Sequence, residues 1–446
     1  MLSVLANRTY RHLFMAQLVA LVGTGLATVA LGLLAVDIAG ANGGAVLGTA
    51  MAIKMVAYIG VAPVVGAYAS RLPRRAFLVA MDAVRALVAL ALPFVDQVWH
   101  IYVLIFVLQS ASAGFTPTFQ ATIPDILPEE KEYTKALSLS RLAYDMESLT
   151  SPILAAVLLS VINFHWLFGG TAVGFVCSAL LVISVTLPRP KPSPRQGSIY
   201  DNTTRGTRVY LKTPRLRGLL AVTLAAAAAS AMVIVNTPVM IREILGFGQS
   251  QVAVTLAAFG GGSMIAALLL PRLLDKRADR TVMVAAASVL TAALLALAAS
   301  WQFHESTAYW IALLAGWFVL GAAYSASITP SGRLLRRSSN SEDRPALFAA
   351  QFALSHVCWL LAYPLAGQVG ARFGMGTAFA AAAVLAAIGT AIALVIWPAH
   401  DPSVLPHSHD NLPQDDPHLL EHHPGGVSAH EYVIDDRHPH WPSVRV

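Results

Sequence analysis

Charged residues are scarce in this chain. Asp, Glu, Lys and Arg make up 12% of its 446 residues, about half the share of roughly 25% that soluble domains carry. Apolar residues account for 56%. A surface that faces water throughout is not expected from so few charges, so the composition predicts a membrane protein.

Cysteines are few, and the motifs of enzymes are missing. The chain has two cysteines, Cys177 and Cys358, and both lie in apolar runs, which excludes a disulfide framework and a thiolate metal site. No phosphate-binding G-x-x-x-x-G-K-S/T loop occurs, and no set of nucleophile, base and orienting residue is recognisable. We therefore expect neither an enzyme nor direct coupling to ATP hydrolysis, and no cofactor.

Apolar runs long enough to cross a bilayer recur along the sequence. An α-helix of about 20 residues spans about 30 Å of hydrocarbon, and twelve such runs predict an all-α polytopic membrane protein. The first run is too long for the apolar region of a cleavable signal peptide, so we expect it to remain. The predicted spans are 13–36, 46–69, 76–95, 99–119, 136–161, 166–187, 218–241, 248–270, 281–301, 308–328, 345–368 and 374–397.

Basic residues are distributed very unequally between alternate loops. With the N-terminus inside, the N-terminal segment and the internal loops hold 23 Lys and Arg residues and the external loops hold two, Arg242 and Arg372. The positive-inside rule then predicts that both termini are cytoplasmic. The net charge of +6 follows from this topology, and nucleic-acid binding is not needed to explain it.

The longest internal loop divides the chain into two parts with six spans each. We expect an N-terminal half at 1–187, a cytoplasmic linker at 188–217, a C-terminal half at 218–397 and a tail at 398–446. The sequence after the second span, Gly66 to Arg75, is echoed after the eighth span by Pro271 to Arg280. Such an echo is typical of parallel repeats in transporters.

These loop sequences resemble the major facilitator superfamily over about residues 1–397. In that family a pattern like G-x-x-x-D-R-x-G-R-R after the second span of each half is thought to lock the cytoplasmic gate. The first copy here has Ser70 for the Asp and Pro73 for the Gly, and the second has Pro271 for the first Gly. The resemblance therefore assigns a gate role to the retained residues Gly66, Arg71, Arg74, Arg75, Asp275, Lys276 and Arg280. Positive-inside charge alone explains the arginines about as well.

Further motifs are similar to the efflux branch of that family. They are Asn7 to Arg11, Phe115-Thr-Pro117 and the run from Ala136 to Arg141 with Tyr144-Asp145. Together with a histidine-rich tail they resemble bacterial nickel-resistance exporters. The resemblance implies a bacterial inner-membrane location and a monomer in the lipid bilayer. The glycine-rich fifth-span pattern of many drug/proton antiporters is absent, since Ser151-Pro152 is followed by Ile-Leu-Ala-Ala.

Six ionisable residues lie inside predicted spans, all of them in the N-terminal half. A charge at the bilayer centre costs at least about 2.5 kcal/mol, so each should face the bundle interior and find a partner. Their spacing predicts two pairs on shared helix faces, Asp82 with Arg85 and Arg141 with Asp145. The six are Lys54, Asp82, Arg85, Arg141, Asp145 and Glu147.

Two interpretations of this charge network stay open. One makes Glu147 or Asp145 a proton carrier, and Glu147 is the better candidate because it has no partner nearby in its own helix. The other is a set of salt bridges that hold the spans in register. In the C-terminal half only weaker polar candidates lie in mid-span, Asn236, Gln351 and His356, and a lone histidine is more often packing than a metal ligand.

The tail is unusually rich in histidine. Nine of the fourteen histidines fall between His400 and Val446, among acids and seven prolines, and we expect this segment to be disordered. Imidazole suits nickel, cobalt, copper and zinc, although a solvated or pH-sensitive extension is the alternative. The candidate metal ligands are His400, His407, His409, His418, His422, His423, His430, His438 and His440.

The preferred expectation is a proton-coupled exporter of a divalent transition metal, nickel and possibly cobalt, which works by alternating access. The nickel assignment comes from the resemblance alone. Efflux of an organic compound such as a drug or siderophore is the main alternative. A membrane metal sensor is an alternative of another class.

Overall fold

A computed structural model of the protein describes residues 2–39, 43–69, 72–188, 198–305, 309–401, 404–407 and 428–442. Within these ranges twelve helices are long and apolar enough to cross a membrane, which confirms the predicted fold class and all twelve spans. They are α1 (Arg8–Ala39), α2 (Gly43–Ala69), α3 (Arg74–Ala91), α4 (Val98–Ile126), α5 (Glu130–Leu159), α6 (His165–Ile183), α8 (Pro214–Pro238), α9 (Gln249–Leu274), α10 (Asp279–Ser300), α11 (Tyr309–Ile328), α13 (Arg344–Phe373) and α14 (Met375–Ile396).

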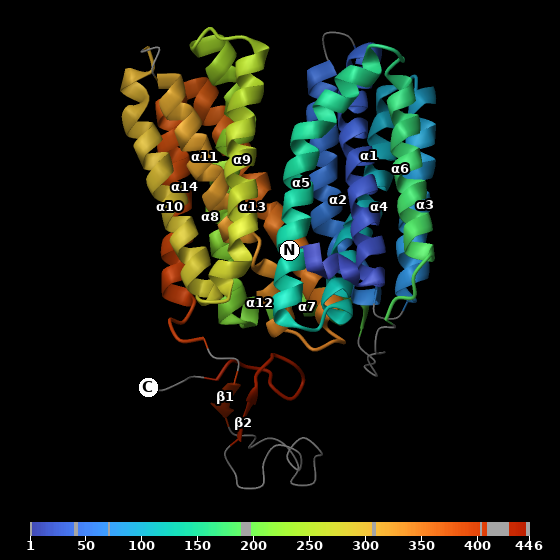
Figure 1. Cartoon of the computed structure of the whole chain (residues 1–446), viewed down its shortest axis with the longest axis vertical. Coiled ribbons are helices and arrows are strands. Elements are labelled where there is room, and N and C mark those ends of the chain that lie inside the picture. Colours follow the sequence, from blue (N-terminus) through green and yellow to red (C-terminus); the bar gives the residue numbers. More distant parts are fainter. Residues whose placement is uncertain are drawn as a thin grey trace.

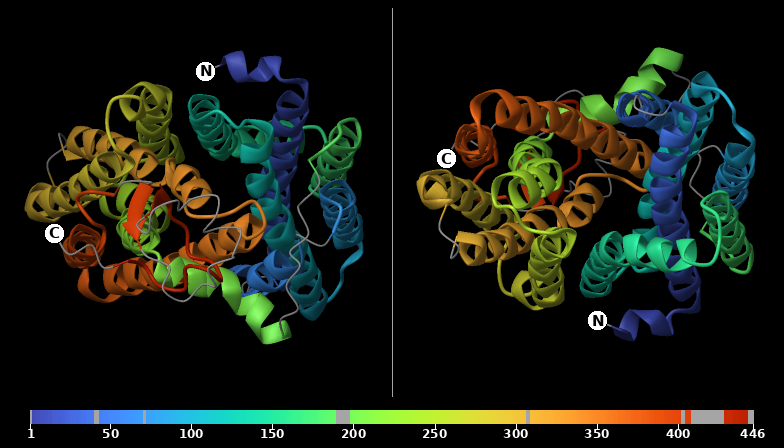
Figure 2. Two further views of the ribbon diagram at one scale, coloured as in Figure 1. Left: turned by 90° about the horizontal axis from the view of Figure 1, so that it is seen from below. Right: turned by 90° about the horizontal axis from the view of Figure 1, so that it is seen from above.

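The helices form two bundles that stand side by side, α1 to α6 in one and α8 to α14 in the other (Figure 1). Each bundle has its own apolar core. In the C-terminal bundle it surrounds the largely buried α8, and in the N-terminal bundle it is divided between two clusters. Figure 2 views the pair along the bundle axis. We call the end that carries the tail and the linker the tail face, and the other end the open end.

Small residues allow neighbouring helices to approach closely within each bundle. A Cβ added to Gly262 on α9 would lie 2.0 Å from the carbonyl oxygen of Phe318 on α11, and one on Gly321 of α11 would lie 1.9 Å from that of Phe259. Gly23 on α1 approaches α6 less closely, with an added Cβ 3.1 Å from the carbonyl oxygen of Thr171. Backbone proximity of this kind is how membrane helices gain packing energy, so these glycines serve the packing of neighbouring helices.

The linker contains more structure than a loop. The amphipathic helix α7 (Ile199–Lys212) begins at Ser198, whose side chain accepts a hydrogen bond from the backbone N–H of Asp201 at 3.1 Å. Gly206 lets α7 rest on α13, where an added Cβ would lie 2.2 Å from the carbonyl oxygen of Ala346. α8 starts at Pro214, four residues earlier than predicted.

The expectation of a disordered tail is wrong for the part that the structure describes. Strands β1 (Val404–His407) and β2 (Ser428–Glu431) pair antiparallel, with Leu405 opposite His430. Leu405, Tyr432 and Ile434 are buried against the C-terminal core. These few apolar residues anchor the tail to the C-terminal bundle. They are too few to change the polar average composition, from which disorder was predicted.

Polar contacts also hold the tail to the tail face. Asp436 accepts a hydrogen bond from Arg205 of α7 at 2.8 Å, and the guanidinium of Arg215, almost fully buried, lies 4.9 Å from the ring centre of Trp441. Burial acts to raise the pKa of Asp435, but hydrogen bonds from the His438 ring and nearby backbone N–H groups outweigh it and lower that pKa to about 2. Asp435 is therefore ionised at neutral pH.

We predict that Gly262→Ala destabilises the protein by about 1–3 kcal/mol, because the new methyl group must force α9 and α11 apart. The neighbouring Gly261 is the matched control, since a Cβ there meets nothing within 4 Å. Thermal unfolding in detergent should show a lower midpoint for Gly262→Ala only. Equal midpoints for the two variants would contradict this account of the crossing.

Candidate transport site

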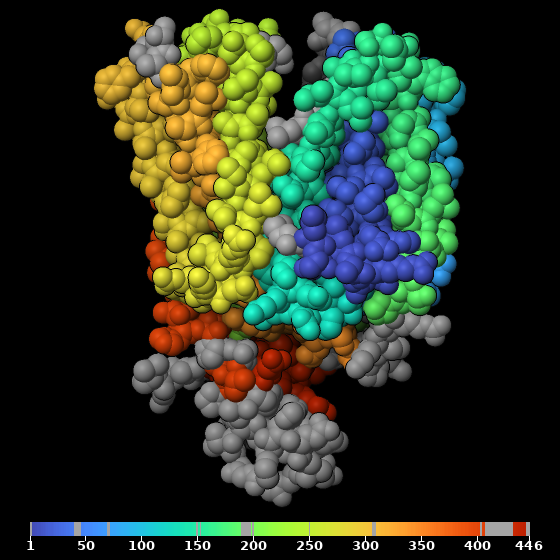
Figure 3. Space-filling view, in the orientation of Figure 1, coloured from blue at the N-terminus to red at the C-terminus, as the bar shows by residue number. Residues whose placement is uncertain are grey.

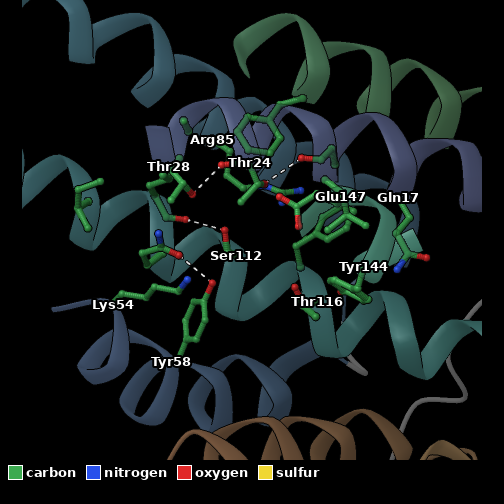
Figure 4. A pocket seen from close by; sticks show the side chains of 18 of the residues that line it. Gln17, Thr24, Thr28, Lys54, Tyr58, Arg85, Ser112, Thr116, Tyr144 and Glu147 are labelled. Carbon is green, nitrogen blue, oxygen red and sulfur yellow. Dashed lines mark hydrogen bonds between the residues drawn. The ribbon is translucent and has the colours of Figure 1, made fainter. Parts of the chain in front are cut away.

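A cavity of about 410 Å³ lies in the N-terminal bundle, between α1, α2, α3, α4, α5 and α6. Helix α13 of the other bundle contributes Phe352 and His356 to its wall. Figure 4 shows how side chains from several helices converge on this space. Its lining includes Gln17, Thr24, Thr28, Lys54, Tyr58, Arg85, Gln109, Ser112, Phe115, Thr116, Phe119, Gln120, Tyr144, Glu147 and Phe175.

The cavity wall combines aromatic rings with neutral hydrogen-bonding groups. The Tyr58 hydroxyl donates to Gln109 Oε1 at 2.8 Å, and the ring of His356 packs edge-on against Tyr58 with centroids 4.6 Å apart. Pockets of about 300–1,000 Å³ with an apolar lining and a few convergent polar groups are typical sites for small organic molecules. Its size and chemistry fit such a molecule.

Arg85 reaches the cavity wall but is already neutralised. It forms a buried ion pair with Asp82, which also accepts a hydrogen bond from Ser178 at 2.8 Å. The guanidinium lies between the rings of Phe115 and Phe175, 4.1 and 4.5 Å from their centres. The predicted pairing of Asp82 with Arg85 is confirmed, and aromatic faces share in stabilising the cation.

Lys54 and Glu147 are the other two charges on this wall, and their situation differs. Among the described side chains neither forms an ion pair. Each acts electrostatically on the other across the cavity from α2 and α5. The Ser151 hydroxyl donates to Glu147 Oε1 at 3.3 Å, and Lys54 Nζ lies 5.5 Å from the Tyr58 ring centre. This carboxylate can exchange a proton or a cationic partner without breaking a salt bridge.

Arg141 and Asp145 form the second predicted pair, but they face the other bundle. The Asp145 carboxylate accepts a hydrogen bond from Ser263 of α9 at 2.6 Å, and Arg141 lies 4.8 Å from the Tyr324 ring centre on α11. The pairing is therefore confirmed. Its position makes it a contact between the halves and leaves it off the cavity wall.

Possible metal ligands do not gather at the cavity. Over the described parts of the chain, no group of three or more His, Cys, Asp and Glu residues could hold a metal ion. His356 bonds through Nδ1 to the carbonyl oxygen of Phe352, 2.7 Å away. In the tail, His438 is buried against Asp435 at 2.9 Å.

The other tail histidines differ in how far the structure describes them. His400 and His440 are exposed. His407 and His430 belong to the strands, where only their backbones are described. His409, His418, His422 and His423 lie outside the described residues.

Charged side chains join the two halves at the tail face. Asp125, at the end of α4, binds Arg74 of its own half at 2.5 Å and also Arg344, at the start of α13 in the other half. Asp125 therefore forms a bridge between the halves. Its side chain is 18% exposed and that of Arg74 is 2% exposed, so water screens this bridge only partly.

A second group of contacts closes the same end. The short helix α12 (Ser331–Arg337) places Arg333 between Asp279 and Glu130, the first residue of α5, and Arg333 Nη1 donates to Thr134 at 2.5 Å. Arg336 donates to the carbonyl oxygen of Pro128. We call the bridges of Asp125 and Glu130 to arginines of the C-terminal half the tail-face clamp.

The motif residues taken from the family pattern contribute only partly to this clamp. Gly66 allows α2 to contact α13, with an added Cβ 2.4 Å from Ala349, and Arg280 donates to carbonyl oxygens of Leu394 and Trp397. Arg71 lies outside the described residues, whereas Arg75, Asp275 and Lys276 are exposed.

Sequence analysis missed Asp125, Glu130, Arg333 and Arg344 as functional candidates. The available signal was a set of carboxylates in Pro124-Asp-Ile-Leu-Pro-Glu-Glu130, in one internal loop, and an arginine-rich stretch in another. Without the fold, the positive-inside rule already explained those arginines.

At the end of the molecule away from the tail face, the two bundles separate. In Figure 3 the space-filling surface shows a gap between α5 and α9 at the open end, which closes toward the tail face. Together with the tail-face clamp, this makes the arrangement open at one end and sealed at the other, as alternating access requires.

Comparisons with known proteins agree with this architecture. The family model for the Major Facilitator Superfamily matches residues 13–313 and 219–421. The uncharacterised transporter YfiS of Bacillus subtilis is 25% identical over 206 residues, 45% of each chain. Macrolide efflux protein A of Enterococcus faecalis is 26% identical over 153 residues, 32% of this chain and 47% of the relative. The matched segments thus span about half the length of these relatives.

Solved structures share the fold at low sequence identity. The human organic anion transporter MFSD10 superposes with a TM-score of 0.74 at 13% identity, covering 86% of this chain and 99% of its own. A bacterial homologue of the iron transporter ferroportin, in an outward-facing state, gives 0.73 at 12% identity and covers 87% of this chain and 98% of its own. Twelve spanning helices in two bundles and a family match over most of the sequence lead to one conclusion: this chain is a multi-pass membrane protein of the major facilitator superfamily.

Proposed function

We propose that this transporter exports an amphipathic organic compound in exchange for protons. The cavity carries the proposal: about 410 Å³ lined by aromatic rings, amides and hydroxyls suits an organic molecule better than a bare ion. The partial similarity to macrolide efflux protein A supports the direction of transport.

Glu147 is the proposed coupling residue. In an antiporter, proton and substrate must not occupy the carrier together, so the substrate binds while Glu147 is ionised and leaves when it is protonated. This competition favours a substrate with positive charge. Lys54 is positioned to stabilise the empty, ionised carboxylate until the substrate arrives.

Export of nickel, and possibly cobalt, is the second candidate. The concentration of nine histidines in the last 47 residues favours it. The cavity supports it less, since Glu147 is the one carboxylate and His356 the one imidazole on its described wall, and His356 is already hydrogen-bonded. In this version the tail captures metal and the cavity carries it.

The proposed orientation places the tail face in the cytoplasm of a bacterial inner membrane. The asymmetry of 23 to two basic residues supports it. The arrangement then has the gap between its bundles facing the outside and its cytoplasmic end closed by the tail-face clamp. Opening inward requires these ion pairs to separate.

We predict that Glu147→Gln abolishes the dependence of transport on an imposed pH gradient while the protein still folds and inserts. Asp145→Asn should act differently. It leaves Arg141 without its carboxylate between the halves, a destabilisation of about 3–5 kcal/mol for a fully buried pair. Transport into inverted vesicles and thermal unfolding separate the two effects. Wild-type gradient dependence in Glu147→Gln would remove this residue from coupling.

We predict that Asp125→Asn opens the tail face, because Arg74 and Arg344 lose the carboxylate that joins the halves. A reporter cysteine at Thr116, on the cavity wall, should then react with a membrane-impermeant thiol reagent from the cytoplasmic side of inverted vesicles. Both native cysteines are first replaced. The control is Asp275→Asn, at an exposed position of the family motif on the same face. Equal labelling of the two variants would argue against the clamp.

The two substrate classes can be separated in cells of an efflux-deficient bacterial strain. We expect expression to raise resistance to amphipathic organic cations and to lower their accumulation. Glu147→Gln should remove this protection. If nickel or cobalt retention falls instead and organic toxicity is unchanged, metal export is the function. Loss of neither substrate from cells with normally inserted protein would contradict both proposals and favour a sensor.

A matched pair of tail variants tests the metal role. Alanine at His409, His418, His422 and His423 removes four imidazoles and keeps every residue that makes a described docking contact, Trp441 and Asp436 among them. We expect these changes to weaken nickel binding by the purified protein and leave export of organic compounds intact. Truncation after residue 403 also removes Trp441 and Asp436 from the docked surface. A loss of function that appears only on truncation would assign the tail a structural role.

A further inference from the structure

A second hollow, separate from the transport cavity, lies at the tail face. It has a volume of about 420 Å³, and both halves and the tail line it: Glu130 and Tyr133 of the N-terminal half, Asp279 and the stretch around α12 of the C-terminal half, and Glu431 and Val433 of the tail. That stretch contributes Arg333, Arg336, Arg337, Ser339, Asn340, Ser341 and Arg344. The wall is therefore rich in hydrogen-bond donors.

The four arginines of this hollow are not equally compensated. Arg333 pairs with Asp279 and Glu130, Arg337 with Asp401, and Arg344 with Asp125. Arg336 has no carboxylate partner among the described residues. It donates to the carbonyl oxygen of Pro128 and lies 5.7 Å from the ring centre of Tyr133. A half-buried guanidinium without a counter-charge is costly unless an anion meets it.

Unsatisfied donors accompany this uncompensated charge. Arg336 Nη1, Arg337 Nε, Arg344 Nε and Tyr133 Oη are all buried and have no protein partner in the described parts of the chain. All four belong to side chains that line the hollow. Buried N–H and O–H groups are rarely left unpaired, and here four of them belong to side chains around a space large enough for a tetrahedral oxyanion.

We infer that this hollow binds a phosphate group. Phosphate oxygens accept several charge-assisted hydrogen bonds at once, and arginine side chains match their geometry. The ligand can be inorganic phosphate or the phosphodiester of an anionic lipid, since both present the same oxygens. Such a group contacts Arg336 and Arg344 of one half and Tyr133 of the other, so its binding stabilises the closed tail face.

The first experiment measures thermal unfolding of the full-length protein in detergent, with sodium phosphate against sodium chloride at equal ionic strength. We expect phosphate to raise the unfolding midpoint of wild type in a saturable manner. Arg336→Gln should weaken the apparent phosphate affinity at least tenfold. Arg277→Gln, which removes an exposed arginine elsewhere on the tail face, should respond like wild type.

A second variant keeps the test valid if Arg336→Gln fails to fold. Ser341→Glu places a carboxylate in the hollow, so it should melt higher than wild type without phosphate and lose the phosphate response. Nanodiscs of phosphatidylcholine with and without phosphatidylglycerol identify the source. Stabilisation by phosphatidylglycerol that disappears in Arg336→Gln assigns the site to lipid, and a response to inorganic phosphate alone assigns it to the free ion. No response in either arm, or equal responses in all variants, would overturn the inference.

Discussion

The shared use of Asp125 by Arg74 and Arg344 is the interaction on which the arrangement of the molecule depends. It joins the halves at one end, while the surfaces of α5 and α9 separate at the other end (Figure 3). Buried ion pairs suit this task because a partly separated pair is unstable: a buried charge that loses its partner is left uncompensated. A carrier that must open alternately at its two ends needs contacts that are either formed or broken.

The intramembrane charges show how one physical constraint separates structural from functional residues. An unpaired charge is costly in hydrocarbon. Two of the three carboxylates inside the spans offset this cost with a salt bridge, Asp82 inside the bundle and Asp145 between the halves. Glu147 does not. It faces the cavity with Lys54 nearby but outside ion-pair distance. We therefore propose this unpaired carboxylate as the group that exchanges its partner during a transport cycle.

The tail face brings together features that lie far apart in the sequence. Strands β1 and β2, helix α7 and helix α12 meet there (Figure 1), and Arg205 of α7 contacts both Asp343, just before α13, and Asp436 of the tail. The linker and tail therefore lie against the elements that form the tail-face clamp. Any ligand of the tail or of the phosphate hollow acts on the same closed end.

Hydropathy and charge spacing were enough to predict the fold and part of the site. Long apolar runs placed all twelve spans, and intervals of three and four residues predicted the pairs of Asp82 and Asp145, because a helix fixes local geometry. The clamp was not predictable. Asp125 and Arg344 are 219 residues apart, and nothing local marks them as partners. The docked tail was missed for a related reason, since single anchors such as Trp441 do not alter an average composition.

The most direct test of alternating access is a pair of distances measured by double electron–electron resonance in a protein without its native cysteines. One pair of spin labels, at Lys131 and Arg277, reports on the tail face, and the other, at Ser160 and Ser250, reports on the open end; all four residues are exposed. The account predicts that a change of pH shifts the two distance distributions in opposite directions. Distances that change together, or at one end only, would contradict it.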